Sequence, residues 1–384
     1  MKGLDRIIKA TGSKLAEAIL EFKGNKVLFG KKYEPQRLLY DLYPQFLVVK
    51  AGRQVGKSLG LAGRITTGSI SQPHFNSLFI APSQIQTKRW SGGYLDAFRD
   101  SKYISKYYVN NKDPGNVFEK TFSNKSKVYL SYGQTSADMD RVRGLTADLL
   151  CLDEVQDIEL ASVPIVKEIL NTSEYGYQLF TGTSKSSAGT LEQLWQETNQ
   201  MHFVKKCARC SKWVIPDNFD TCMEMVTNPD YMVCPHCHKE FSFYGGQWVA
   251  AMSELSKGRG AKYGMSLPQL IFGANTATGS RQWDDLYDKV QQSKNGVLYT
   301  AETVANEIFG LATDLGATSL SITEAKRCCY NDYTEWPKPD KSNVPASIMP
   351  LINGIHSTVL GVDWSVSGSI GSHTVVSVLG IDHS

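Results

Sequence analysis

The segment from Phe46 to Ser58 constrains the fold of this chain more than any other. The apolar run Phe46-Leu47-Val48-Val49 leads into a turn that ends in Gly56-Lys57-Ser58. A buried strand that passes through such a turn into a helix surrounds a phosphate with backbone N–H groups and the positive end of the helix. Where the pattern G-x-x-x-x-G-K-[ST] has its first glycine, this chain has Ala51, and Gly52 follows one position later. The segment predicts a phosphate-binding loop with one irregular position.

The loop also supplies side chains that would bind a nucleotide and its metal ion. Lys57 is expected to reach the β- and γ-phosphates of a nucleotide, and the hydroxyl of Ser58 is expected to bind Mg²⁺. A chance occurrence of Gly-Lys-Ser is the alternative if the tripeptide stands alone. The predicted nucleotide ligands in the loop are Gly52, Arg53, Gln54, Val55, Gly56, Lys57 and Ser58.

A second apolar run ends in two carboxylates. The residues Leu149-Leu150-Cys151-Leu152 lead directly into Asp153 and Glu154. In a parallel sheet, such a strand carries both side chains to its C-terminal end, where ligands bind. Asp153 suits the shell of Mg²⁺, and Glu154 suits the base that orients and deprotonates an attacking water. Alone, the run could be a buried strand before a solvated acidic turn, but with the phosphate loop it predicts ATP hydrolysis.

Strand and helix patterns alternate through the first half of the chain. Helices are predicted at residues 7–22, 38–43, 59–67 and 84–99, and further strands at 77–82, 127–132 and 177–183. This alternation predicts an α/β fold with a mainly parallel sheet flanked by helices. Thr181 and Thr183 end the last of these strands, where Thr183 could sense the γ-phosphate or simply belong to a strand-ending turn.

Three further positions are candidates for nucleotide contacts. Arg53 in the loop and Arg143 upstream of the acidic strand compete as the arginine that stabilises the transferred phosphate, a role worth about 10³–10⁵ in rate. A surface ion pair is the alternative for each arginine. Gln36, with Tyr33 beside it, precedes the first strand and could read and stack on an adenine, or lie in a surface turn.

Four of the eight cysteines form two C-x-x-C pairs, Cys207 with Cys210 and Cys234 with Cys237. Each pair suits a turn that presents two thiolates, and together they close a tetrahedral Zn²⁺ shell with no position left for a reactive water. We expect a structural zinc ribbon, with a redox-active pair as the alternative. His236 and His238 are surplus to such a shell, and Cys151, Cys222, Cys328 and Cys329 are expected to be ordinary thiols.

Charge and hydropathy restrict the partners. The net charge of +3 comes from 41 Lys and Arg against 38 Asp and Glu, so no overall field indicates a nucleic acid. A DNA contact would need a local basic patch, for which Lys31-Lys32, residues 102–112 and residues 120–127 are candidates, although solvated surfaces explain them equally well. We expect a cytoplasmic protein without a membrane partner, because no stretch approaches the roughly 20 apolar residues of a membrane span.

The order of these motifs resembles the large subunit of a tailed-phage terminase, the ATP-driven DNA-packaging motor. The resemblance covers most of the chain, and it is carried by Gln36, Arg53 to Ser58, Ile80-Ala81-Pro82, Arg143-Gly144, Asp153-Glu154, Thr181-Gly182-Thr183 and Asn306-Glu307-Ile308-Phe309-Gly310. It implies a P-loop NTPase of the ASCE type that uses ATP and Mg²⁺. It also implies adenine recognition by Gln36, catalysis by Glu154, coupling through Thr181 to Thr183, and an Arg143 that reaches a neighbouring subunit's nucleotide.

The same resemblance implies partners and a location. The expected partners are double-stranded DNA, a small terminase subunit and the capsid portal, in the host cytoplasm. Assembled chains are expected to form a homo-oligomeric ring, and an isolated chain could be a monomer. The alternatives are a helicase-like translocase, which would need a second ATPase-like domain that residues 245–350 do not suggest, and an inactive fragment that serves as a binding or structural piece.

The family's second activity is a two-metal nuclease with a ribonuclease-H-like fold. Residues 358–365 resemble its first strand, with Asp363 as the first metal ligand, and residues 374–382 resemble the antiparallel neighbour. Two-metal chemistry needs several converging carboxylates, so we expect a nuclease domain that is cut short and inactive in this chain alone. The expected organisation is an ATPase domain at 1–202, a zinc ribbon at 203–243, the rest of the ATPase with a lid and linker at 244–350, and the start of the nuclease at 355–384.

Overall fold

The structure, a computed structural model, describes residues 4–109, 116–256, 258, 260–272, 281–296, 298–313, 357–363 and 375–381. The chain divides into two compact units, Met1–Ser319 and Leu320–Ser384. Among the described helices, none has both the length and the apolar character needed to cross a membrane.

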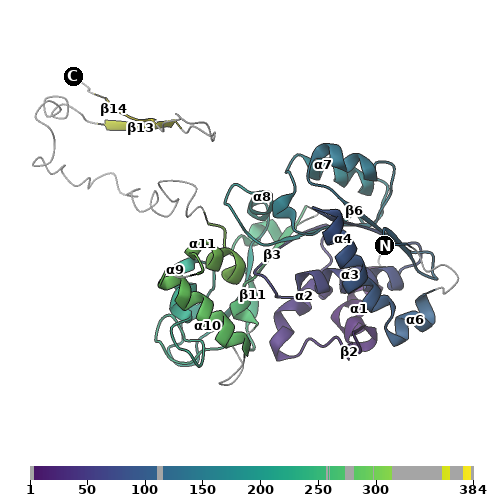
Figure 1. The fold of residues 1–384 in the computed structure, drawn as a ribbon, viewed down its shortest axis with the longest axis horizontal. Helices are drawn as coiled ribbons and strands as arrows, with labels where there is room; N and C mark the ends of the chain where they lie inside the picture. The colour runs from purple at the N-terminus through teal and green to yellow at the C-terminus, as the bar shows by residue number, and fades with distance from the viewer. Residues whose placement is uncertain are drawn as a thin grey trace, which may run out of the picture. The chain divides into compact units, whose positions relative to one another are not determined.

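A large mixed sheet forms the centre of the first unit (Figure 1). Its middle strands are all parallel and lie in the order β9-β12-β3-β8-β7-β4-β6. At one edge β5 is antiparallel to β6, and at the other β10 and β11 are antiparallel to β9. The α/β fold with a mainly parallel sheet is confirmed. The strands are β3 Phe46–Ala51, β4 Asn76–Ala81, β5 Glu119–Thr121, β6 Lys127–Tyr132, β7 Leu149–Leu152, β8 Tyr177–Gly182, β9 Met201–Lys206, β10 Trp213–Val214, β11 Gln247–Ala250 and β12 Lys262–Leu267.

Helices cover both faces of this sheet, which is why its central strands are apolar along their whole length. Every residue of β3 and of β7 is buried. Alternate residues of β3 enter two different cores, since Leu47 and Val49 pack with one cluster while Phe46 and Val48 pack with the other. In Figure 1, α7 and α8 lie on one side of the sheet and α1 to α3 on the opposite side.

The helices follow the sequence patterns closely. The predicted helix at 59–67 is the centre of α3, and the one at 84–99 is α4 and α5 joined by a π-type turn at Ser91–Leu95. The first helix ends at Ile19, and Glu21–Phe22 (β1) pairs instead with Asn25–Lys26 (β2). The helices are α1 Leu4–Ile19, α2 Arg37–Asp41, α3 Lys57–Ser71, α4 Gln84–Trp90, α5 Asp96–Arg99, α6 Lys102–Tyr108, α7 Ser162–Lys167, α8 Thr190–Gln196, α9 Phe219–Met225, α10 Arg281–Lys294 and α11 Ala301–Thr303, followed by the π-type turn η8 Val304–Phe309.

Two parallel strands have no counterpart in the predicted set. β9 and β12 extend the sheet beyond β3, and β12 pairs with β3 along six residues, from Lys262 opposite Phe46 to Leu267 opposite Ala51. The chain leaves the sheet at the end of β9, passes through the cysteine pairs, and returns first as β11, which pairs with β9, and then as β12. The cysteine segment is therefore an excursion between two neighbouring strands of one sheet.

The second unit contains an antiparallel pair, β13 Ser357–Asp363 and β14 Val375–Ile381, with Asp363 opposite Val375. These strands coincide with the two that were predicted, while the ribonuclease-H-like fold stays a prediction. The side chain of Asp363, the predicted strand ends at residues 364, 365, 374 and 382, and Cys328 and Cys329 lie outside the described residues.

Candidate active site

The phosphate loop joins β3 to α3, and its irregular glycine has a structural reason. Ala51 is the last residue of β3, buried and paired with Leu267. Gly52 follows it, and a Cβ there would lie 2.8 Å from the carbonyl oxygen of Ile308 and 2.9 Å from that of Glu307. Gly56 has a φ of +81°, in the left-handed region that favours glycine. The first glycine is therefore needed where η8 approaches the loop.

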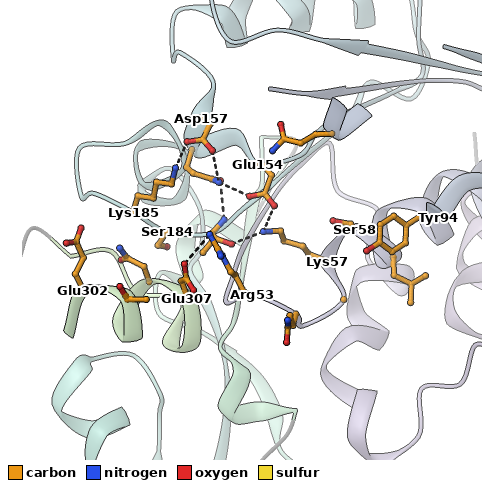
Figure 2. Close-up of a pocket in the computed structure, with 18 residues that line it drawn as sticks. Arg53, Lys57, Ser58, Tyr94, Glu154, Asp157, Ser184, Lys185, Glu302 and Glu307 are labelled. Atoms are coloured by element: carbon orange, nitrogen blue, oxygen red, sulfur yellow. Dashed lines mark hydrogen bonds and ion pairs between the residues drawn. The ribbon is translucent and has the colours of Figure 1, made fainter. Parts of the chain in front are cut away.

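Lys57 connects three strand ends. Its Nζ lies 2.8 Å from Oε1 of Glu154, which follows β7, and donates a hydrogen bond of 2.7 Å to Oγ1 of Thr183, which follows β8 (Figure 2). The lysine side chain is only 10% exposed. The predicted meeting of the phosphate loop with the acidic strand end is thus a direct ion pair in this structure.

Asp153 lies beneath this pair. Its Oδ2 accepts a hydrogen bond of 3.1 Å from Oγ of Ser58, and its Oδ1 accepts one of 2.6 Å from Oγ1 of Thr181. Burial raises the pKa of Asp153, the charge of Glu154 adds to the rise, and Lys57 with the two hydroxyl donors opposes it. A buried carboxylate beside a hydroxyl gives two oxygen ligands of the kind that Mg²⁺ prefers, so this pair fits that cation.

Glu154 is held on both sides. Its backbone has a φ of +52°, an uncommon conformation for this residue type that is often found at functional sites. Oε1 faces Lys57, and Oε2 accepts a hydrogen bond of 2.7 Å from Nε2 of Gln156. Burial acts to raise the pKa of Glu154, but the charge of Lys57 and the bonds from Lys57 and Gln156 outweigh it and lower the pKa. Glu154 is therefore ionised near neutral pH.

Gln156 is a site residue that the sequence analysis missed. While its Nε2 holds Glu154, its Oε1 accepts a hydrogen bond of 3.1 Å from the backbone N–H of Thr183. The neighbouring Gly182 leaves the space for it, because a Cβ at that position would lie 2.2 Å from the same Oε1. One amide therefore connects the general-base candidate to the strand end that carries the threonines.

These groups open into a cavity of about 620 Å³, within the size range of small-molecule sites. It brings together Arg53, Gln54, Gly56, Lys57, Ser58, Glu154 and Thr183, all of them predicted site residues. Lining residues that were not predicted include Gln86, Tyr94, Gln156, Asp157, Ser184, Lys185, Glu302, Thr303, Asn306 and Glu307.

The two candidate arginines lie in different places. Arg53 is in the cavity wall, where its NH2 group is 3.1 Å from Oε1 of Glu307 (Figure 2). Arg143 is outside the lining, with its Nε 2.8 Å from Oδ1 of Asp140 and its side chain 68% exposed. Of these two arginines, only Arg53 lines the cavity of its own chain.

A smaller cavity of about 220 Å³ adjoins the loop on another side. Gln36 lines it, and its Nε2 donates to the carbonyl oxygen of Val55. Tyr33 and Phe272 contribute aromatic rings to the same wall. This cavity and the larger one share Gln54, Gly56 and Leu59, so both adjoin the phosphate loop.

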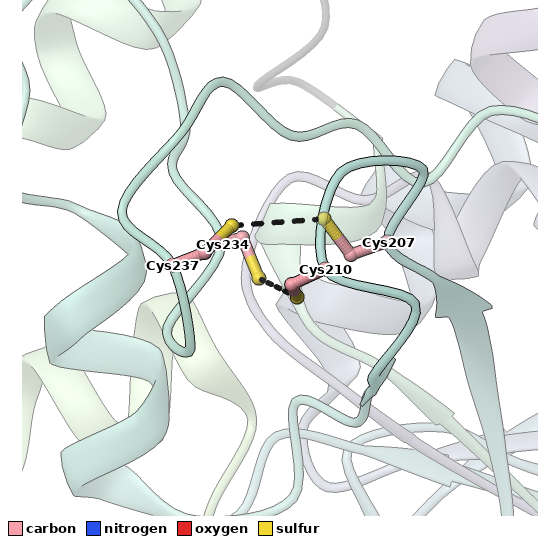
Figure 3. A group of neighbouring side chains, drawn as sticks. All are labelled: Cys207, Cys210, Cys234 and Cys237. Atoms are coloured by element: carbon pink, nitrogen blue, oxygen red, sulfur yellow. Dashed lines mark hydrogen bonds between the residues drawn. The ribbon is translucent and has the colours of Figure 1, made fainter.

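The cysteine pairs converge as predicted. All four sulfur atoms lie within 4.8 Å of one another, with 3.9 Å between Cys207 and Cys237 and 3.8 Å between Cys210 and Cys234 (Figure 3). A tetrahedron with metal–sulfur bonds of about 2.3 Å has edges of about 3.8 Å. The four thiols are free, and their spacing fits one tetrahedral metal ion.

The two pairs are presented by matching backbone turns. The N–H of Cys207 bonds to the carbonyl of Lys212 at 2.8 Å, and the N–H of Cys234 bonds to that of Lys239 at 2.8 Å. The fourth residue after the first cysteine of each pair, Ser211 or His238, has a positive φ in both turns. The surplus His236 contacts the Trp213 carbonyl through Nε2 at 3.1 Å.

Comparisons with known proteins find phage terminases. The family model "Phage terminase large subunit gpA, ATPase domain" matches residues 33–251. The large terminase ATPase domain of Thermus phage P74-26 is 13% identical with a TM-score of 0.42, covering 72% of this chain and 92% of that one. The large terminase of another thermophilic bacteriophage, solved in complex with ADP, is 10% identical with a TM-score of 0.42, covering 73% of this chain and 53% of that one.

The large terminase of bacteriophage HK97 is 14% identical with a TM-score of 0.38, covering 49% of this chain and 39% of that one. This chain thus spans about half or less of the ADP-bound terminase and of the HK97 protein. No curated protein sequence matches it. Because the family model matches more than half of the residues, the chain belongs to the phage terminase large subunit gpA family and contains its ATPase domain, an ATP hydrolase of the DNA-packaging machinery.

Proposed function

We propose that this chain hydrolyses ATP to drive double-stranded DNA into a procapsid. One observation carries the proposal: the glycine-flanked turn at Lys57 meets the acidic strand end at the same end of parallel strands, with Lys57 and Glu154 in the wall of one cavity and the buried Asp153 bonded to Ser58. That edge is where ligands bind in open α/β sheets. The family match to an ATPase domain of a packaging protein supports the same reaction.

Each side chain at the site has its own role in ATP hydrolysis. Lys57 exchanges the carboxylate of Glu154 for the β- and γ-phosphates when a nucleotide enters the loop. Ser58 and Asp153 would hold Mg²⁺, which neutralises charge on the phosphate oxygens. Glu154, ionised and released from Lys57, orients the attacking water and accepts its proton. Thr183 loses its bond from Lys57 in the same exchange, so the strand end responds to the terminal phosphate.

The smaller cavity suits the adenine. Gln36 offers both a donor and an acceptor through its amide, which is what reading the edge of a base requires. Tyr33 and Phe272 supply rings against which a base can stack. Because this cavity shares loop residues with the larger one, a single nucleotide can occupy both.

Each arginine could supply the positive charge that stabilises the transition state, Arg53 within its own subunit and Arg143 in a neighbouring one. Arg53 can act within its own subunit if it leaves Glu307. Arg143 forms an exposed pair with Asp140, the kind that contributes little stability, so it can exchange partners for a neighbour's nucleotide in a ring. The assembly would also include the small terminase subunit and the capsid portal in the host cytoplasm.

Two further sites belong to this proposal. Cys207, Cys210, Cys234 and Cys237 would hold a structural Zn²⁺, since their sulfur spacing matches its tetrahedral shell. Asp363, at the end of β13, would be one metal ligand of the nuclease that accompanies the ATPase in the family.

Substitution of the general base tests the proposal. We expect Glu154→Gln to lower ATP turnover by about 10²–10⁴-fold, because the amide cannot accept a proton. Binding of a fluorescent ATP analogue should remain, because Lys57 and Ser58 are kept. Glu302→Gln is the control, since Glu302 lines the same cavity but is exposed. If Glu154→Gln turned over ATP as fast as wild type, Glu154 would not be the base and this mechanism would be wrong.

A further inference from the structure

A second large cavity lies in the cysteine segment, where nothing above assigns a ligand. Its volume is about 620 Å³, and it opens between the two cysteine turns and the strand β9. Three cationic side chains line it, those of Lys205, Arg209 and Lys239. Tyr231 and Phe241 add aromatic surface, and Glu240 is the one acid in its lining. We call this cavity the ribbon hollow.

The charge in the ribbon hollow is available to a ligand. Arg209 and Lys239 are exposed, and neither forms an ion pair with any residue that the structure describes. Lys205 is half-buried and donates to the Tyr244 carbonyl, which leaves its charge uncompensated. Unlike Glu240, the acids between the two cysteine turns, Asp217, Asp220, Glu224 and Asp230, are not in the lining of the hollow.

The cations are also held in position. Arg209 lies between Cys207 and Cys210 inside the first turn, and the carbonyl of Lys239 accepts the N–H bond that closes the second turn. The backbone that spaces the four sulfur atoms therefore also fixes the positions from which the two cationic side chains extend. A preformed arrangement of charges loses less entropy when it binds than a mobile one.

We propose that the ribbon hollow binds the phosphate backbone of double-stranded DNA, an inference that rests on the proposed function. Arginine, lysine and tyrosine side chains are the usual donors to phosphate oxygens, and such contacts position a duplex without reading its sequence. The hollow is much wider than a single phosphate needs, which favours a polyanion that brings several phosphates to separate cations.

The ribbon hollow is connected to the active site by packing. Phe219 of α9 contacts Phe309 of η8, with ring centroids 6.0 Å apart, and Nε2 of Gln291 in α10 donates to the Val226 carbonyl at 3.0 Å. η8 also carries Glu307, which pairs with Arg53 in the phosphate loop. DNA held in the ribbon hollow therefore contacts the segment that packs on one wall of the nucleotide cavity.

The test compares DNA binding by four forms of the full zinc-loaded chain. Arg209→Ala/Lys239→Ala removes two cations from the hollow, and Glu240→Gln removes its acid. Lys102→Ala/Lys106→Ala removes two lysines from α6 and serves as a charge-matched comparison with the rival basic patch at residues 102–112. Fluorescence anisotropy with a short labelled duplex gives Kd between about 50 and 200 mM salt, the range over which phosphate contacts are weakened. Zinc content and ATP turnover without DNA should match wild type in all variants.

Each phosphate contact contributes about 0.9 to the slope of log K against log salt. We expect the double variant in the hollow to reduce that slope by about 1.8, so its affinity should fall about 12-fold less than wild type between the two salt concentrations. Glu240→Gln should bind more tightly than wild type, and the α6 control should keep the wild-type slope.

Three results would overturn the inference. Wild-type slope and affinity in Arg209→Ala/Lys239→Ala would show that the hollow does not contact DNA, while the proposed function would stand. A slope reduced only in the α6 variant would move the contact to that helix. Hydrolysis of ATP without any binding of duplex DNA by wild type would refute the DNA-driving part of the proposed function as well.

Discussion

Replacement of Gly52 by alanine tests how the phosphate loop is built. Gly52 has no positive φ, so its backbone would accept any residue, and the constraint comes from what surrounds it. The new Cβ would lie 2.8 Å from the Ile308 carbonyl oxygen and 2.9 Å from that of Glu307, which are backbone atoms that cannot rotate away. The two segments must separate by roughly 0.5 Å, since carbon and oxygen rarely approach closer than about 3.4 Å.

The magnitude follows from the contacts that hold η8 to the loop. Overpacking of this kind costs about 1–3 kcal/mol. Separation by that amount would leave the 2.6 Å bond from the Arg53 N–H to the Glu307 carbonyl within the ordinary range of about 2.7–3.2 Å, so the bond itself should be kept. Alanine restores about 0.4–1 kcal/mol by reducing the entropy of the unfolded chain. We expect a net loss of about 1–2 kcal/mol in the free energy of unfolding.

Thermal unfolding followed by circular dichroism measures this loss. At about 2–4 °C per kcal/mol for a unit of this size, Tm should fall by roughly 2–8 °C. Gly30→Ala is the matched control, because its φ is −67° and a Cβ there has no atom within 4 Å. The reasoning is refuted if Gly52→Ala and Gly30→Ala melt together at the wild-type temperature, because η8 would then not constrain Gly52.

Three further outcomes are expected. Glu192→Ala should lower the free energy of unfolding by about 3–5 kcal/mol in denaturant, because it leaves the buried Lys50, now 3.3 Å from Glu192, without a counter-charge. Replacing Glu192 with Leu and Lys50 with Met together should recover most of that loss, and no recovery would contradict the ion-pair argument. Chelation of zinc should make residues 207–237 sensitive to limited proteolysis, and unchanged protection would argue against a structural metal. Burial lowers the pKa of His202 to about 4, so stability should be complete above about pH 6.5 and decrease as the pH falls towards 4, because the unfolded state binds the proton first. His202→Phe should lack this decrease in pH-dependent melting, and an identical pH profile would assign the effect to other groups.

Sequence patterns found residues that the structure brings together where residues close together in the chain carry the signal. The loop at Lys57, the carboxylates at Asp153 and Glu154 and the cysteine turns are each local, and the parallel sheet brings the first two together. The predicted roles of Gln36, Arg53 and Arg143 stay predictions. The structure adds that only the first two line a cavity beside the loop.

The rest depended on contacts between distant segments. Gln156 is recognisable only beside Gly182, whose missing side chain makes room for its amide. Glu307 joins the site because η8 returns to the loop more than two hundred residues later. β12 reads Lys-Tyr-Gly-Met-Ser-Leu, a short mixed run, and its place beside β3 comes from pairing that no local pattern specifies.

The placement of β12 has a mechanical consequence. The cysteine excursion is anchored by β9 at one end and by β11, its antiparallel neighbour, at the other, and β12 follows β11 and pairs with β9 in the parallel sense. A pull on the ribbon along the direction of β9 would load the bonds between β9 and β12 in shear, so that they must fail together, whereas peeling breaks such bonds one after another. Since β12 also runs alongside β3, that tension would pass directly into the strand that ends at the phosphate loop.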